Sequence, residues 1–120
     1  MNGISLNSSS ANTVKNISDV KGNGNYGIII SNSSSSNKVI GVKVDSNKKS
    51  GIAVSGSSSS NTLTNNVSKN NGGNGVLIYN SANNIVSASS FSANKNYGLT
   101  ISGNSRSNKA TLCNSNNNKK

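Results

Sequence analysis

The sequence predicts an all-β solenoid in which about five coils of roughly 24 residues stack along one axis. A glycine followed one and three places later by an aliphatic residue recurs at Gly3, Gly27, Gly51, Gly75 and Gly98, with spacings of 24, 24, 24 and 23 residues. A regular period in this range is typical of stacked repeat architectures. Within each repeat, apolar and polar residues alternate over short runs, which is the two-residue period of strands and not the stripe of a helix.

Composition alone favours a disordered chain. Ser and Asn supply 53 of the 120 residues, and Leu, Ile, Val and Phe together number only 25. Such a content lies near the limit below which strongly charged chains do not fold. Disordered low-complexity sequence has no reason to keep its aliphatic residues in register over five repeats, so we favour the folded solenoid.

Three short strands are expected in each coil, separated by clusters of Ser, Asn and Gly. If each repeat winds once around an axis, every strand pairs in parallel with its counterpart about 4.8 Å away in the next coil. We expect the repeats to span residues 1–113 and residues 114–120 to form a polar, disordered tail. The apolar residues that mark the strands are Ile4, Leu6, Val14, Ile17 and Val20; Ile28, Ile30, Val39, Val42 and Val44; Ile52, Val54, Leu63 and Val67; Val76, Ile78, Val86 and Phe91; and Leu99, Ile101, Ala110 and Leu112.

Asparagine recurs at fixed places in the repeat. Four residues before each of the later glycines stand Asn23, Asn47, Asn71 and Asn94. Stacked side-chain amides can form a hydrogen-bonded ladder, as they do in cross-β assemblies. A second asparagine opens the middle strand of every coil, and we assign a structural role to both columns: the second consists of Asn12, Asn37, Asn61, Asn84 and Asn108.

The repeat Asn-x-x-x-Gly-Ile-x-Ile, followed by a Ser-rich turn and Asn-x-Val, resembles the right-handed parallel β-helix repeat. That repeat occurs in NosD-type periplasmic proteins, pectate-lyase-like enzymes and adhesin-like surface proteins. The resemblance covers residues 3–112 and implies the fold, an extracellular or envelope location and carbohydrate ligands. It does not specify an activity, because this fold carries many functions.

Catalytic chemistry is not predicted within these residues. Polysaccharide hydrolysis requires a carboxylate pair, and the two acidic residues, Asp19 and Asp45, lie in no motif of the family's hydrolases. Asp45 shares its place in the repeat with Lys21 and Lys69, which we interpret as a surface ion-pair ladder. A chain without histidine has no Ser-His-Asp triad, and its single cysteine, Cys113, offers no copper or zinc site. We therefore predict no catalytic residue, no metal and no cofactor.

One candidate ligand surface runs along the first strand of each coil. The residues two places after the glycines, Ser5, Ile29, Ala53, Leu77 and Thr100, are expected to face outward. With nearby tyrosines they make a partly apolar strip suited to sugar rings. We name as candidate ligand strip Tyr26, Ile29, Leu77, Tyr79, Tyr97 and Thr100.

A second candidate surface is basic. Twelve Lys and Arg against two Asp give a net charge of +10, which favours contact with anionic polymers. The lysines alternate with Gly or Asp along the turn before the glycines, which we interpret as avoidance of stacked like charges. The candidate basic edge consists of Lys21, Lys48, Lys49, Lys69 and Lys95. No specific nucleic-acid motif is present.

Neither a membrane span nor an export signal is evident in the sequence, so either the protein is cytoplasmic or the segment belongs to a longer exported chain. The family resemblance favours the second alternative, a segment of a longer cell-surface or secreted chain. Uncapped solenoid ends expose unpaired strand edges, and we therefore expect either end-to-end self-association of the isolated chain or a fragment whose neighbouring segments cap the ends.

The leading hypothesis is a non-catalytic structural or adhesive module with weak carbohydrate binding. Two alternatives stay open: a fragment of a polysaccharide lyase or hydrolase whose catalytic residues lie outside this chain, and a basic polyanion-binding rod.

Overall fold

The computed structural model describes all 120 residues and consists of fifteen short strands without a helix. Each coil contributes three strands in succession. They are β1 (Ile4–Asn7), β2 (Thr13–Lys15), β3 (Val20–Lys21), β4 (Ile28–Ser31), β5 (Lys38–Ile40), β6 (Lys43–Asp45), β7 (Ile52–Val54), β8 (Thr62–Thr64), β9 (Val67–Lys69), β10 (Val76–Tyr79), β11 (Ile85–Ser87), β12 (Ser90–Ser92), β13 (Leu99–Ser102), β14 (Lys109–Thr111) and β15 (Asn114–Asn116).

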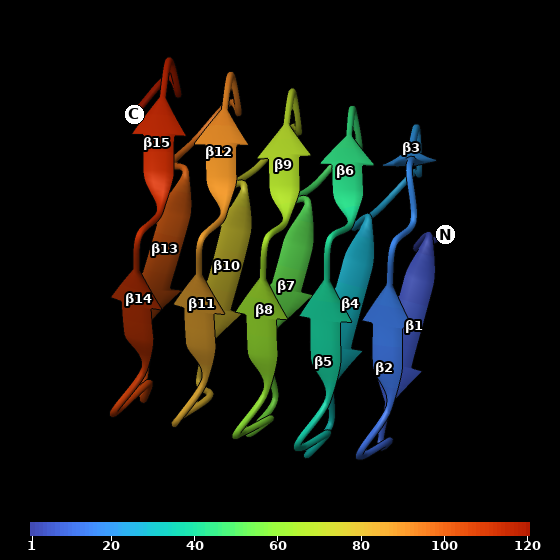
Figure 1. The fold of residues 1–120 in the computed structure, drawn as a ribbon, viewed down its shortest axis with the longest axis vertical. Helices are drawn as coiled ribbons and strands as arrows, with labels where there is room; N and C mark the ends of the chain where they lie inside the picture. The colour runs from blue at the N-terminus through green and yellow to red at the C-terminus, as the bar shows by residue number, and fades with distance from the viewer.

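The strands form three parallel five-stranded sheets along one axis (Figure 1). Sheet A has the order β1-β4-β7-β10-β13, sheet B β2-β5-β8-β11-β14, and sheet C β3-β6-β9-β12-β15. Every strand therefore pairs with its counterparts one coil away, and Ile4, Ile28, Ile52, Val76 and Leu99 stand in one column. The predicted all-β solenoid of five coils is confirmed.

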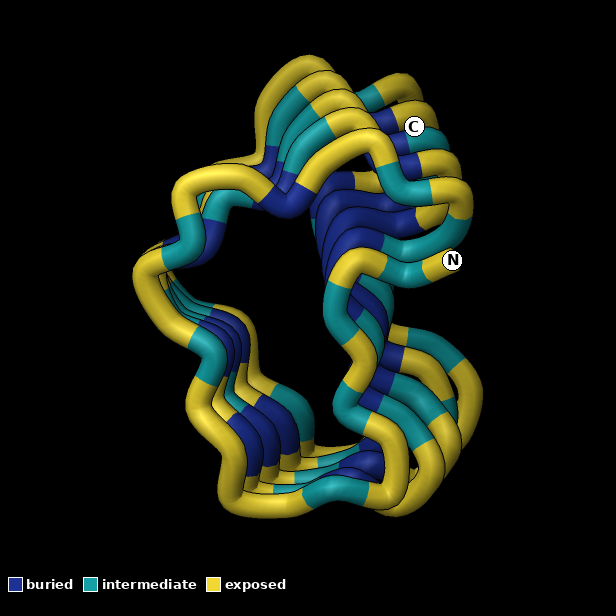
Figure 2. Tube along the Cα trace, turned by 90° about the vertical axis from the view of Figure 1, so that its right-hand side faces the viewer, coloured by how far each residue is buried: buried dark blue, intermediate teal, exposed yellow.

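The core fills the inside of the coil, where the buried residues line the tube seen along its axis (Figure 2). In β4, Ile28 and Ile30 are fully buried whereas Ile29 between them is only partly covered, as the two-residue period of a strand requires. Each fully buried aliphatic side chain contributes about 1.5–3 kcal/mol. The core cluster consists of Val20, Ile28, Ile30, Val39, Val42, Val44, Ile52, Val54, Leu63, Val76, Ile78, Val86 and Phe91.

The repeating glycines lie where sheet C turns into sheet A, against the next coil. A Cβ atom on Gly27 would lie 2.7 Å from the carbonyl oxygen of Gly51 and 2.8 Å from the side-chain nitrogen of Asn47. Both distances are far below van der Waals contact, so a larger residue would push the coils apart. Close packing between coils therefore explains the 24-residue glycine period.

Both predicted asparagine columns are hydrogen-bonded ladders. Asn47 donates from its backbone N–H and its side-chain amide to Oδ1 of Asn71, at 3.0 and 3.1 Å, and Asn71 donates in the same way to Asn94. The second column repeats this geometry, for example from Asn37 to Asn61. Asn47, Asn71 and Asn94 are at most 2% exposed, so each amide bonds inside the protein.

Four corners per coil take a left-handed backbone conformation, and in coils two and three the first corner contains a second such residue, Ser33 and Ser57. They end sheet A, precede sheet B, join sheets B and C, and follow sheet C. Asn, Ser and Gly occupy most of them because they adopt positive φ more readily than other residues. The first corners are Ser8, Asn32, Gly56, Asn80 and Gly103; the second Ala11, Ser36, Ser60, Asn83 and Ser107; the third Asn16, Gly41, Asn65, Ala88 and Leu112; the fourth Gly22, Ser46, Asn70, Ala93 and Asn117.

Two expectations about the strands were wrong. In β9 the residue that points inward is Ser68, fully buried between Val44 and Phe91, whereas Val67 faces outward and is 39% exposed. Ser68 is tolerated in the core because its hydroxyl donates to the Gly75 carbonyl at 2.7 Å. Leu112, taken as a strand residue, is a corner and 87% exposed.

The end of the chain also differs from the expected disordered tail. Residues 114–116 form β15, which pairs with β12 and completes the third strand of coil five. Asn118 then extends the first ladder, because its Oδ1 accepts the backbone N–H and side-chain amide of Asn94 at 3.0 and 2.9 Å. The polar character of residues 114–120 therefore reflects an outer coil and does not prevent strand pairing.

A serine column was missed in the sequence. The hydroxyls of Ser34, Ser58, Ser81 and Ser105 each accept a backbone N–H from the preceding coil at 3.0–3.1 Å. These serines lie after sheet A within the Ser-rich turn. Because the adjacent residues are also serines, the repeating position cannot be recognised in the sequence.

Candidate functional site

The outer face of sheet A carries the candidate ligand strip. Ser5, Ile29, Ala53, Leu77 and Thr100 pair in register and form one outward row along the axis. Ala53 is only 1% exposed between Ile29 and Leu77, so its small side chain does not project from the middle of the row. In the backbone trace, turns project beyond sheet A at both ends of its strands (Figure 2).

The three tyrosines do not form one cluster. Tyr26 and Tyr97 each precede the glycine of a coil and therefore share a column, three coils apart, or about 14 Å at the strand spacing. Tyr79 lies at the other end of β10, in a second outward row, where it pairs with Ser102. Tyr79 and Tyr97 are 48% and 50% exposed. The face thus offers separate aromatic contacts and no aromatic cage.

Asn74 connects this face to its flanking turn and was not singled out in the sequence. Its Oδ1 accepts the backbone N–H of Tyr97 and the hydroxyl of Thr100, both at 3.1 Å, and its own N–H donates to the Ser50 hydroxyl at 3.0 Å. Asn74 therefore fixes the turn that carries Tyr97. Its position directly before Gly75, matching Tyr26 and Tyr97 before their glycines, was the available signal.

Three lysines of the basic edge, Lys48, Lys49 and Lys95, lie beside this face on the turns between sheets C and A. Lys21 and Lys69 do not lie on these turns, because they end strands β3 and β9 of sheet C. Backbone hydrogen bonds stack Lys48 on Asn23, Gly72 on Asn47 and Lys95 on Asn71, which holds the lysines in a row along the axis. The Nζ of Lys49 lies 5.2 Å from the centre of the Tyr26 ring, within range of a cation–π interaction. The edge therefore borders the ligand strip at Tyr26.

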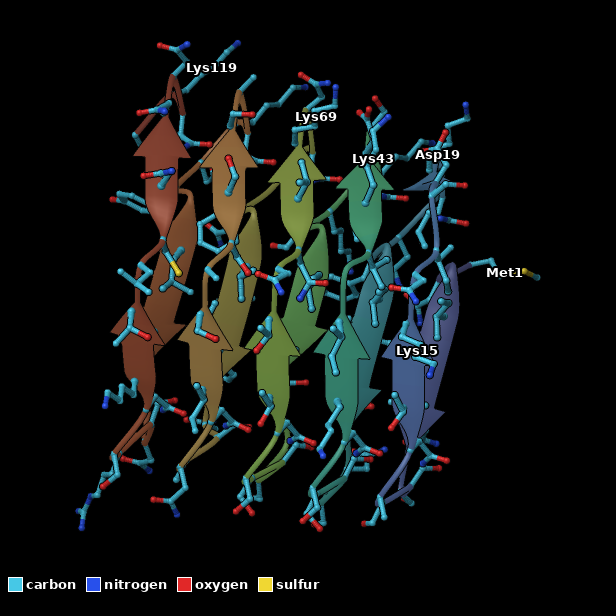
Figure 3. The ribbon with its side chains drawn as sticks, in the orientation of Figure 1. Met1, Lys15, Asp19, Lys43, Lys69 and Lys119 are labelled. Carbon is cyan, nitrogen blue, oxygen red and sulfur yellow. The ribbon has the colours of Figure 1, made fainter.

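The glycines within this edge have a steric cause. A Cβ atom on Gly72 would collide with the carbonyl oxygen of Lys48, and one on Gly73 would lie 2.8 Å from the backbone nitrogen of Ser50. Lys119 and Lys120 extend the same two rows by one coil and were not included in the predicted edge. Figure 3 shows Lys119 beyond the end of β15, on the side where Lys69 ends β9.

The predicted ion-pair ladder is half present. Lys21, Asp45 and Lys69 do stand in one column. Lys69 pairs with Asp45 at 3.7 Å, but Lys21 instead pairs with Asp19, at 2.8 Å. Asp19 precedes β3 in the same coil as Lys21, and this local contact replaces the one between coils. Both pairs lie at the surface, where such contacts contribute at most about 1 kcal/mol.

The titration of these groups follows from their contacts. Partial burial by itself raises the pKa of Asp45, but hydrogen bonds from Ser46 and Asn70, with Lys69 and Lys43 nearby, outweigh it and hold that pKa below its ordinary value. The hydrogen bond and negative charge of Asp19 raise the pKa of Lys21. The Asp45 carboxylate therefore stays ionised at neutral pH beside Lys69.

Comparison with known families decides the class of the protein. The family model described as "Right handed beta helix region" matches residues 1–117. The chain belongs to this family. No curated protein compared with this β-helix matches it significantly.

Two solved structures share the fold of this β-helix. They are the periplasmic alginate epimerase AlgG and a point mutant of it, each with a TM-score of 0.78 and 16% sequence identity. The match covers 93% of this chain and 36% of AlgG, so the chain spans about a third of that enzyme's length. An identity this low indicates the shared fold alone.

Few side chains of the β-helix are of the types that bind metal ions or catalyse reactions. No three His, Cys, Asp or Glu side chains lie together as metal ligands would. No helix long and apolar enough to cross a membrane is present. Asp19 and Asp45 lie at sheet C, which is a different side of the coil from the ligand strip on sheet A.

Proposed function

We propose that this β-helix is a non-catalytic structural or adhesive module of an extracellular or cell-surface protein that binds a glycan along the outer face of sheet A. The observation that carries the proposal is the row from Ile29 to Thr100, in which apolar and hydroxyl side chains repeat at the coil spacing beside exposed tyrosines. Sugar rings pack on aromatic and aliphatic faces, and the amides and hydroxyls of the turns suit their hydroxyl groups.

Two features favour binding without turnover. The only two acidic side chains, Asp19 and Asp45, are paired with lysines at sheet C, so neither faces the strip. The strip itself contains no Asp, Glu, His, Cys or Lys side chain. Glycoside cleavage needs an acid and a base or nucleophile at the same bond.

A second candidate is that this β-helix is part of a polysaccharide-active enzyme whose catalytic coils lie elsewhere. The observation in its favour is the match to AlgG, a carbohydrate-modifying enzyme about three times as long. In that case sheet A would extend the substrate-binding surface of the longer protein.

Titration calorimetry with neutral and acidic oligosaccharides tests the binding proposal. Tyr97→Ala and Leu77→Ser should weaken binding several-fold, whereas Ile85→Ala, an equally exposed apolar residue on sheet B, should not. Equal effects of all three substitutions would contradict a site on sheet A. Binding that disappears with added salt and in Lys48→Ala/Lys95→Ala, but not in Tyr97→Ala, would instead identify a polyanion-binding rod.

The absence of turnover is tested on the same protein. Incubation with alginate and polygalacturonate, with and without calcium, should release no product and leave the polymers unchanged. Reproducible turnover that is lost in Asp45→Asn would overturn the non-catalytic proposal.

A further inference from the structure

Asn74 carries an unpaired hydrogen-bond donor at the edge of the sheet A face. Its Oδ1 accepts the backbone N–H of Tyr97 and the hydroxyl of Thr100, both at 3.1 Å. A backbone N–H can only donate, so the contact with Tyr97 fixes which end of the side chain is the oxygen. Asn74 is 8% exposed, yet its Nδ2 donates to no group of the protein and is open to solvent. Because nearly buried polar groups are normally hydrogen-bonded, this free amide indicates a place for a ligand.

The neighbour of this amide in the preceding coil also has a free donor. Ser50 is 4% exposed, and its oxygen accepts the backbone N–H of Asn74 at 3.0 Å. Its hydroxyl proton has no acceptor within the protein. Both side-chain oxygens are therefore engaged, whereas the Ser50 proton and the two Nδ2 protons of Asn74 are free. A set of donors without a free carbonyl suits a ligand group that only accepts hydrogen bonds, as the oxygens of an anion do.

Three lysines lie within one coil of Asn74 along the axis. Lys48 and Lys49 belong to the turn of the preceding coil, and Lys95 belongs to the turn of the following coil. The residue between Lys48 and Lys95 in their shared row is Gly72, so no side chain separates them. The turns between sheets C and A contain no acidic residue, and both carboxylates of the chain pair with lysines of sheet C. The positive charge beside Asn74 is therefore not neutralised within the chain.

These donors lie on three sides of one position. The amide of Asn74 and the hydroxyl of Ser50 lie at the edge of the sheet, with two lysines one coil before them and one lysine a coil after. A phosphate or sulfate ester presents three terminal oxygens, whereas a carboxylate presents two. Lysine binds such groups as a point charge and needs no fixed planar geometry. The arrangement therefore favours a tetrahedral oxyanion.

We propose that Asn74, Ser50 and the flanking lysines form a binding site for a sulfate or phosphate ester group. The hydroxyl of Thr100, which bonds to Asn74, belongs to the ligand strip, so the site adjoins the strip directly. We assign the ester to the glycan that lies on sheet A, and this assignment rests on the proposed function. The ring packs on the strip and on Tyr97 while its ester contacts the free donors. The site thus selects an esterified glycan over a neutral one.

Nuclear magnetic resonance of the isotope-labelled protein tests the site without a glycan. Inorganic sulfate and phosphate should shift the Tyr97 N–H and the Asn74 side-chain amide signals saturably, whereas chloride at the same ionic strength should not. Asn74→Asp retains an oxygen for Tyr97 and Thr100 but removes the donor, and it should weaken sulfate binding about tenfold or more. Asn104→Asp, the same change of charge on an exposed residue of the turn from sheet A to sheet B, is the matched control.

A second pair of variants tests the lysines without altering Asn74. Lys95→Gln should weaken sulfate binding several-fold, whereas Lys109→Gln, an equally exposed lysine on sheet B, should leave it near the wild-type value. Equal weakening within either pair of variants, or the absence of a saturable shift in the wild-type protein, would overturn the site.

Calorimetry with four ligands that share one ring tests the preference for an ester. The ligands are glucose, glucuronate, and the sulfate and phosphate esters of glucose at its primary hydroxyl. Glucuronate and the sulfate ester carry the same charge, so tighter binding of the sulfate ester supports a tetrahedral group, and equal binding would overturn it. The stronger of the two esters identifies the natural group.

The carrier of the ester is tested separately. Esters of glucose that bind no more tightly than inorganic sulfate or phosphate would support the anion site and contradict its link to a glycan. Oligosaccharides that bind on sheet A with no preference for an ester would retain the proposed function and overturn this inference.

Discussion

Replacing Asn71 with alanine tests whether the buried amide ladder stabilises the fold. Asn71 is fully buried at the centre of the first ladder. Its Oδ1 accepts the backbone N–H and the side-chain amide of Asn47, and its own amide donates to Asn94 and to the Ser68 hydroxyl at 3.0 and 3.1 Å. The substitution removes all four of these contacts and leaves their partners in place.

The magnitude follows from which partners find a replacement. The side-chain amide of Asn47 keeps its bond to the Val20 carbonyl, and Oδ1 of Asn94 keeps the backbone N–H of residue 71. The backbone N–H of Asn47, in a residue only 2% exposed, has no other acceptor. One buried unpaired donor and the lost side-chain bonds should together cost about 2–3 kcal/mol. In Asn47→Ala the unpaired donor is on the half-buried Asn23, so the loss should be nearer ~1 kcal/mol.

Urea unfolding followed by far-ultraviolet circular dichroism measures these losses, and the native spectrum should show strand without helix. The matched control is Asn114→Ala, an exposed asparagine with ordinary backbone angles and no side-chain hydrogen bond, which should change stability by less than ~0.5 kcal/mol. Asn32→Ala is a stricter comparison, because φ of 55° adds about 1 kcal/mol of left-handed strain to alanine. If Asn71→Ala were no more harmful than Asn114→Ala, the ladder would contribute nothing and the reasoning would fail.

Three further outcomes are expected. Gly51→Ala should destabilise the fold far more than Gly22→Ala. The Cβ of alanine at position 51 would lie 2.7 Å from the Asn71 side-chain amide, whereas position 22 faces open space and alanine there adds only left-handed strain. Thermal unfolding of the two variants measures the difference. The pKa of Asp45 is lower in the folded chain than in the unfolded chain, so its contribution to stability is complete above about pH 4 and is lost as the pH falls through the folded pKa. Asp45→Asn should therefore reduce the loss of stability in acid, and an unchanged acid profile would argue against it. Deamidation, followed by mass spectrometry of peptides, should be faster at Asn23-Gly24 than at Asn71-Gly72, because the Gly72 N–H that would attack the side chain donates to the Asn47 carbonyl at 2.8 Å.

The sequence was sufficient for the architecture because the same steric demand recurs in every coil. The glycine at the turn into sheet A and the ladder asparagine four residues earlier admit few replacements, so they mark the period without ambiguity. Sheet A and the ladders could be placed from these two columns alone. The candidate strip follows directly, since the residue two places after each glycine must face outward.

Sheet C was harder because its inward positions are not uniformly apolar. Ser68 replaces an aliphatic residue in the core, and Val67 beside it is apolar but exposed. Hydrophobicity therefore assigns Val67 to the inner face of the strand and Ser68 to the outer face, the reverse of the structure. The hydrogen bond that makes Ser68 acceptable joins it to Gly75, seven residues later, and has no local signature. Likewise, nothing in the sequence shows that Lys21 would turn to Asp19 instead of Asp45.

The turn from sheet A to sheet B is one of two places where coils differ in length; the other lies between Asn16 and Gly22 of coil one. The two left-handed corners of the turn from sheet A to sheet B are four residues apart from Asn32 to Ser36 but three apart from Asn80 to Asn83, and the sheets on either side keep their register. A change of one residue is thus absorbed locally and does not propagate along the rod. This turn is consequently the place where a foreign peptide could be grafted into the chain, and where lineages of such rods could diversify by acquiring loops, with the stacked sheets left intact.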